Sequence, residues 1–112
     1  MTPISVKLKK IRDALLTTGA SVYHYRRPPN LNGSIVWAER SDSGDYLYAD
    51  NKLNEQIVTG SIQYWTLNEY DSVIDSIQEA LNSISSIAWR LSFVDYEDDT
   101  GLIYYEWEFT VI

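Results

Sequence analysis

The sequence predicts an α+β protein, and three observations lead to that fold class. Residues 4–15 and 70–84 repeat apolar side chains at helical spacing. The last quarter alternates apolar and polar residues in two runs around a short turn, which indicates a β-hairpin. Residues 56–66 are rich in β-branched and aromatic residues and indicate a long strand, in which Gly60 marks a bulge or a close backbone contact. The length predicts one domain, residues 1–112.

The first helix is expected to start at the amino terminus and to stop at Gly19. Thr2 can cap it, and Pro3 suits the first helical position, where its missing N–H costs nothing. The predicted apolar stripe consists of Ile4, Leu8, Ile11 and Leu15. Lysines and an arginine occupy the remaining faces.

The region between the first helix and the long strand predicts short strands and loops. Residues 21–25 and 34–40 are strand-like, and the proline-rich "RRPPNLNGS" between them favours a loop with an Asn-Gly turn. A turn at 41–45 is expected to return residues 46–50 onto the preceding strand. Residues 51–55 are expected to form a loop.

The second helix has the strongest amphipathic pattern. Thr66 and Glu69 can form a capping box, although Asn68 could cap the helix instead. Acidic residues in the first turn suit the helix dipole. The predicted apolar face consists of Tyr70, Val73, Ile74, Ile77, Leu81 and Ile84.

The terminal hairpin contains an acidic cluster that has two possible meanings. The expected core faces of its strands are Ile87, Trp89, Leu91 and Phe93, and Ile103, Tyr105, Trp107, Phe109 and Val111. Between the strands, "EDDTG" supplies a glycine for the positive-φ position of a hairpin loop. Asp95, Glu97 and Asp99 with Thr100 could bind a hard cation, but an EF-hand needs a longer ligand series between two helices. We interpret the cluster as a solvated turn.

No catalytic motif is present. His24 is the only histidine, and without a G-x-S-x-G elbow it is interpreted as a hydrogen-bonded strand residue. Glu106 and Glu108 share a strand face and could do acid–base work, but a wet outer face is the simpler interpretation. Arg26 and Arg27 could contact phosphate, although a charged, solvated loop is favoured. We expect no enzyme activity, no metal and no cofactor.

Composition and charge narrow the function classes further. The chain has no cysteine, which removes disulfides and thiolate sites. It shows no signal peptide and no apolar run long enough to span a bilayer, so a soluble protein without a membrane partner is expected. The net charge of −7 argues against a free nucleic-acid binder.

The charge is divided unevenly along the chain. Residues 1–40 carry seven basic and two acidic residues (+5), and residues 41–112 carry two basic and fourteen acidic ones (−12). The two regions could neutralise each other within one fold. Alternatively, they could form a polar surface that meets a copy of itself.

Over nearly its whole length the chain resembles the small tail-completion proteins of long-tailed phages and prophages, which include tail terminators and act in head–tail joining. The resemblance rests on "YADNKLNEQIVTGSIQYWT", "NEYDSVIDSIQEALNS" and "IAWRLSFVDYEDDTGLIYYEWEFTV". In that family, a segment with an Asp-Asn pair, here Asp50 and Asn51, leads into a strand, an amphipathic helix and a terminal hairpin. "SVYHYRRP" is also similar to the family's first strand.

The resemblance implies an antiparallel β-sheet of about four to five strands with two α-helices packed on one face. It implies a homo-oligomeric ring, commonly a hexamer, in the tail or neck of the virion, assembled in the host cytoplasm. Such a ring ends tail-tube growth and joins the tail to the head connector, with the tail tube protein and connector proteins as partners. An acidic channel would let DNA pass without specific binding.

The family carries no catalytic residues. The candidate interface residues are Lys7, Lys9, Lys10, Arg26, Arg27, Asp50, Asn51, Glu106 and Glu108. One alternative function is a small acidic protein–protein interaction module, such as an inhibitor or immunity-type protein. Another is a carboxylate-dependent metalloenzyme of the nuclease type, which would need at least three converging acidic groups.

Overall fold

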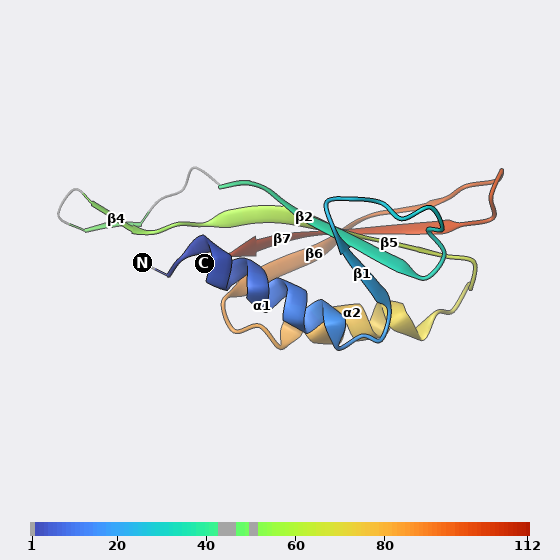
Figure 1. Cartoon of the computed structure of the whole chain (residues 1–112), viewed down its shortest axis with the longest axis horizontal. Helices are drawn as coiled ribbons and strands as arrows, with labels where there is room; N and C mark the ends of the chain where they lie inside the picture. Colours follow the sequence, from blue (N-terminus) through green and yellow to red (C-terminus); the bar gives the residue numbers. More distant parts are fainter. Residues whose placement is uncertain (1, 43–46, 50–51) are drawn as a thin grey trace.

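The computed structural model describes residues 2–42, 47–49 and 52–112. Its helices and strands are α1 (Ile4–Leu16), β1 (Ser21–His24), β2 (Ser34–Asp42), β3 (Leu47–Ala49), β4 (Lys52–Glu55), β5 (Val58–Thr66), α2 (Ser72–Asn82), β6 (Ile87–Tyr96) and β7 (Ile103–Val111). Five strands form one sheet in the order β1-β2-β5-β7-β6, and β3 pairs with β4 alone. Both helices lie on one side of the five-stranded sheet (Figure 1). The predicted α+β class is confirmed.

The sheet is mixed, whereas an antiparallel sheet was expected. Three of its neighbouring pairs are antiparallel, but the edge strand β1 runs parallel to β2. The reason is the long connection through residues 25–33, which returns the chain to the end of the sheet where β1 began. This connection lies over the outer strand face, opposite the helices (Figure 1).

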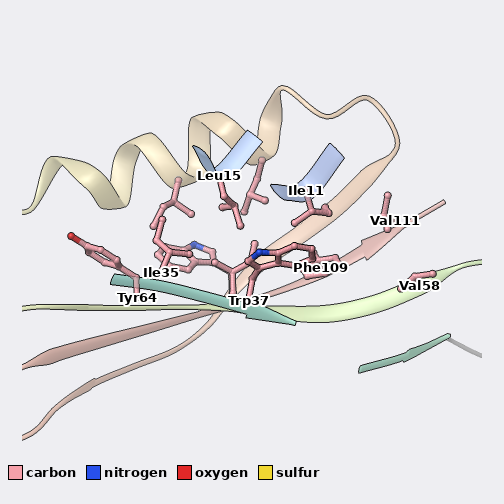
Figure 2. Packing of buried hydrophobic residues seen from close by; sticks show 12 residues of the cluster. Ile11, Leu15, Ile35, Trp37, Val58, Tyr64, Phe109 and Val111 are labelled. Atoms are coloured by element: carbon pink, nitrogen blue, oxygen red, sulfur yellow. The ribbon is translucent and has the colours of Figure 1, made fainter. Parts of the chain in front are cut away.

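The hydrophobic core lies between the two helices and the inner face of the sheet (Figure 2). Trp107 at its centre is completely buried. Ile11 and Leu15 of α1 are buried as the apolar stripe predicted, but Ile4 at the start of the helix is 43% exposed. The remaining members of the buried cluster are Ile35, Trp37, Val58, Ile62, Tyr64, Ile77, Leu81, Phe109 and Val111.

The helix starts differ from those predicted. Pro3 is the N-cap of α1 rather than its first helical residue, and no side chain caps that helix. The N-cap of α2 is Asp71, whose carboxylate accepts a hydrogen bond from the Val73 backbone N–H at 2.9 Å. Asp71 replaces the expected caps because Tyr64 and Thr66 at the end of β5 also donate to its other oxygen. Tyr70 precedes the helix and is 93% exposed, not part of its apolar face.

The strand predicted at 46–50 is present as β3, but its predicted pairing and the predicted loop that follows it are wrong. β3 does not return onto β2 but pairs with β4, which occupies residues expected to form a loop. Strand β5 already pairs with β2 as far as Asp42, so that edge of β2 is not available. The predicted turn at 41–45 falls largely on residues 43–46, which lie outside the described residues.

Two strand irregularities change which side chains share a face. A shift in register between Leu91 and Phe93 sends Phe93 to the outer face, opposite Glu106, although the sequence pattern placed it with Trp89 on the core side. A second shift, between Glu39 and Ser41 of β2, lies beside the close backbone contact that Gly60 was predicted to make. No helix within the described part of the chain combines the length and apolarity that crossing a membrane requires.

Candidate functional site

The solvent face of α1 carries free cations among apolar side chains. Val6 lies one helical turn before Lys9 and Lys10, and Leu16 lies further along the same side. Val6 is 42% and Leu16 is 54% exposed. Neither lysine has an ion-pair partner among the residues that the structure describes. We call Val6, Lys9, Lys10 and Leu16 the α1 surface.

Lys7, which the sequence placed in the candidate interface, instead lies in the interior. It is 1% exposed, its Nζ is 2.6 Å from Glu55 Oε1, and it also donates to the backbone carbonyl of Gln56. The hydrogen bond from Lys7 lowers the pKa of the Glu55 carboxyl below its usual range. Helical periodicity puts Lys7 on the same side of α1 as Ile11, which faces the core. The ion pair of Lys7 with Glu55 therefore links α1 to β4 within one chain.

His24 lies in a cluster of aromatic rings around one carboxylate. Its ring stacks between Tyr25, with centroids 3.8 Å apart, and Trp37, with centroids 3.9 Å apart. Its Nε2 lies 2.7 Å from Glu39 Oε1, and the Tyr25 hydroxyl donates to the other oxygen of Glu39. Tyr25 has a φ of 71°, a conformation that costs an ordinary residue energy and that these contacts maintain.

The charge of Glu39 is stabilised by this arrangement. Burial alone would raise the pKa of its carboxyl, but the hydrogen bonds from Tyr25 and His24 outweigh burial and lower it. The hydrogen bond to Glu39 raises the pKa of the Tyr25 hydroxyl. His24 is therefore a hydrogen-bonded strand residue, as predicted.

A shallow cavity of about 210 Å³ adjoins His24. A nucleophile there would need a hydrogen bond to the imidazole. Ser5 lines the cavity, but no hydrogen bond joins it to His24 among the described contacts. The geometry supplies a histidine–carboxylate pair without an activated nucleophile. The lining residues are Ser5, Leu8, Lys9, Arg12, His24 and Trp37.

The two arginines of the proline-rich loop have different environments. The Arg27 guanidinium lies 5.2 Å from the ring centroid of Trp65, on the outer face of the sheet. Trp65 is buried there, at 2% exposure. Arg26 is exposed and makes no ion pair within the described residues. The loop thus covers the outer face with Arg27 and leaves Arg26 in solvent.

Glu106 and Glu108 both lie on the outer face, as predicted, but each has a different partner. Glu106 accepts a hydrogen bond from Tyr104 at 2.6 Å and lies 3.8 Å from Arg40. Burial and then the hydrogen bond to Glu106 raise the pKa of Tyr104 to about 12. Glu108 pairs with Arg90 at 2.9 Å. Neither carboxylate is arranged to share a proton with the other.

The acidic end of the β6–β7 hairpin forms a second surface. The turn is closed by the Gly101 N–H donating to the Glu97 carbonyl at 2.8 Å, and Gly101 has the expected positive φ of 74°. Among the described residues, no three His, Asp or Glu side chains come together in a way that could hold a metal ion. Asp95, Asp98 and Asp99 are exposed and make no ion pair with any residue in the described part of the chain.

A groove of about 570 Å³ lies at the base of this turn. Leu67 comes from the connection between β5 and α2, and its Cδ2 would lie 3.7 Å from a Cβ added at Gly101. The Leu67 backbone N–H is fixed by Asn32 at 2.9 Å. We call this groove the arm groove. Its lining residues are Leu67, Glu69, Val94, Asp95, Tyr96, Gly101 and Ile103.

The ion pairs decide how far the charge split is neutralised within one chain. Among the described residues, Lys7–Glu55 and Arg40–Glu106 join the basic first forty residues to the acidic remainder. The pairs Arg12–Asp13 and Arg90–Glu108 join residues within one region each, and His24 contacts Glu39 of its own region. The cations of the α1 surface and the carboxylates of the arm groove are therefore not neutralised by each other inside one chain.

Sequence reasoning missed the arm groove because its lining combines separate segments. The signal lay in Val94 and Tyr96, apolar residues that continue into the acidic tip. The predicted interface residues Asp50 and Asn51 lie outside the described residues. Comparison with protein-family models and with curated proteins finds no match for this chain.

Proposed function

We propose that this chain is a structural phage tail protein that forms a ring at the head-proximal end of the tail tube. The ring ends tube growth and joins the tail to the head connector. Support comes from the resemblance of nearly the whole sequence to tail-completion proteins. It also comes from the α+β fold, in which two helices cover one face of a five-stranded sheet.

The observation that carries the proposal is the separation of two unneutralised surfaces. The molecule is elongated, with extents of 54 × 24 × 22 Å. The start of α1 lies toward the β3–β4 end, and the β6–β7 turn lies at the opposite end (Figure 1). A contact between two different patches of identical chains is head-to-tail, and such contacts generate rings when the rotation closes.

The overall charge suits passage of DNA. A net charge of −7 repels phosphate, so a ring of such chains would not retain the genome that moves through it. The proposed partners are other copies of the chain, the tail tube protein and the head connector proteins. The proposed location is the virion tail or neck, after assembly in the host cytoplasm. The proposed role is not enzymatic.

Electron microscopy of tails made with and without this protein tests the proposal. With the protein, we expect tubes of uniform length that carry a ring at one end and attach to heads. Without it, we expect tubes of uncontrolled length and free heads. Tails of normal length that join heads in its absence would contradict the proposal.

A second candidate is a small acidic interaction module that binds another protein. The observation that favours it is the arm groove, whose apolar walls and carboxylates could take a basic apolar segment of a different protein. Oligomeric state separates the two functions. A chain that remains monomeric, also on tail tubes, and captures a basic partner through Leu67 and Tyr96 would support the module.

A further inference from the structure

We propose that the arm groove of one copy receives the α1 surface of the next copy, with Val6 entering the groove and Lys9 and Lys10 facing its carboxylates. The arm groove and the α1 surface are then the two halves of a head-to-tail interface between identical chains. It rests on the self-assembly part of the proposed function, but it does not require a role in phage tails.

The groove offers apolar area together with negative charge. Leu67, Val94 and Tyr96 are 54%, 49% and 57% exposed, which is high for large apolar side chains grouped around one groove. Glu69 and Asp95 line the same groove and have no ion-pair partner in the described part of the chain. An occupant should therefore be apolar at its centre and cationic at its sides.

The α1 surface has that composition. Val6 is followed by Lys9 and Lys10 at spacings of three and four, so the two lysines flank it on the solvent face of the helix. Leu16 adds a second exposed apolar side chain about 15 Å further along the helix. Asp13 lies on the same face, but its carboxylate pairs with Arg12 at 2.8 Å and so offsets no lysine.

Lys7 shows why the neighbouring lysines are suited to a partner. Lys7 is satisfied inside the chain by Glu55, whereas Lys9 and Lys10 point to solvent without a described partner. The carboxylates of the arm groove lie on the hairpin and on the adjoining connection, and the hairpin turn is at the other end of the long axis from the start of α1 (Figure 1). A second copy brings these charges together without distorting the fold.

Engineered cysteines test the contact cleanly, because the chain has no cysteine of its own. Val6→Cys and Leu67→Cys variants are prepared separately, mixed and oxidised, and the linked peptides are identified by mass spectrometry. We expect Val6–Leu67 disulfides to exceed both same-residue disulfides. Glu79→Cys, on the exposed side of α2, is the control and should link to neither above background.

Solution assembly supplies the second measurement. Leu67→Asp changes an exposed residue and should leave the unfolding midpoint within error, but it should weaken self-association by about tenfold or more in sedimentation experiments. Glu79→Ala is its matched control and should leave association unchanged. Lys9→Glu with Lys10→Glu should weaken association, and a partner copy carrying Glu69→Lys with Asp95→Lys should restore it.

Three results would overturn the inference. One is a predominance of same-residue disulfides, which would indicate a two-fold interface. Another is association that Leu67→Asp leaves intact. The third is a chain that remains monomeric at every concentration, also with tube protein present, and forms no Val6–Leu67 disulfide. Val6–Leu67 linkage with normal tails in the absence of the protein would keep this inference and reject the phage role. Abnormal tails in the absence of the protein, together with no Val6–Leu67 disulfide, would support the phage role and reject this inference.

Discussion

The ring of Phe109 lies across the backbone of Gly60, its partner on the neighbouring strand. A Cβ added at Gly60 would lie 2.4 Å from Phe109 Cζ and 2.3 Å from the backbone oxygen of Ala38. Both distances are well below van der Waals contact. No side chain other than hydrogen fits between β2 and β7 here, so this glycine allows the central strands to approach while Phe109 fills the core.

Gly60→Ala should therefore be severely destabilising. We expect it to lower the free energy of unfolding by about 3 kcal/mol or more, because the Ala38 carbonyl belongs to the backbone and cannot turn aside. Gly33→Ala is the comparison: it has a φ of 76° but open space around it, and should cost about 1–2 kcal/mol. Urea denaturation measures both, and a Gly60→Ala protein as stable as Gly33→Ala would refute the steric argument.

The tryptophans of the hairpin should differ in their contribution to stability. Trp107 is completely buried, and Trp107→Ala should cost about 3–5 kcal/mol. Trp89 is only partly buried and packs at the margin of the core, so Trp89→Ala should cost less. Asp98→Ala, at the exposed tip, should cost well under about 1 kcal/mol. Thermal or urea unfolding would contradict the core assignment if Asp98→Ala were the most harmful of the three.

The cap of α2 should make stability depend on acid. Burial alone would raise the pKa of Asp71, but hydrogen bonds from Tyr64, Thr66 and the Val73 backbone outweigh it and lower that pKa below its ordinary value of 3.8. A carboxyl with a lowered folded pKa stabilises the fold above its unfolded pKa, and this contribution disappears as pH falls through the folded pKa.

Two substitutions separate the cap from the charge. Asp71→Ala should cost about 1–2 kcal/mol at neutral pH, because three donors lose their acceptor. Asp71→Asn can still cap the helix, but its side chain does not titrate. The free energy of unfolding of this variant should therefore fall less below about pH 4 than that of the wild type. Asp75→Asn, on the exposed side of α2, is the control. Denaturation curves at several pH values measure the effect, and equal acid sensitivity of Asp71→Asn and wild type would contradict it.

The lysines of α1 should divide between stability and assembly. Lys7→Met should lower the urea midpoint because Glu55 and the Gln56 carbonyl lose their donor, whereas Lys9→Met and Lys10→Met should leave it nearly unchanged. Reversal of Lys9 and Lys10 to Glu should slow assembly and weaken its dependence on salt. Salt acts on the wild type because the Debye length falls from about 10 Å at 0.1 M to about 3 Å at 1 M, which screens the attraction between the two surfaces. Light scattering after a concentration jump measures assembly, with tube protein as template if free chains do not associate. If neither salt nor the charge reversal of Lys9 and Lys10 changed the rate of assembly, the uneven charge along the chain would play no part in contacts between copies.

Local patterns in the sequence determined the two helices, the long strand and the terminal hairpin. Helical spacing identifies Ile11 and Leu15 as core residues, and strict alternation does the same for Trp107 and Phe109, because each pattern reports one face of one element. The positive φ of Gly101 followed from the turn composition alone. These features depend on neighbours a few residues apart, which the sequence displays side by side.

The tertiary structure decided what depends on partners distant in sequence. The shift at Ser92 moves Phe93 to the outer face, because a bulge reverses an alternation that otherwise continues unbroken. Lys7 is drawn into the interior by Glu55, forty-eight residues away, and Asp71 becomes a cap because Tyr64 and Thr66 converge on it. The arm groove likewise exists only where Leu67 meets the hairpin. Each outcome is set by which strands pair and in what register, and that pairing is a property of the whole packed chain.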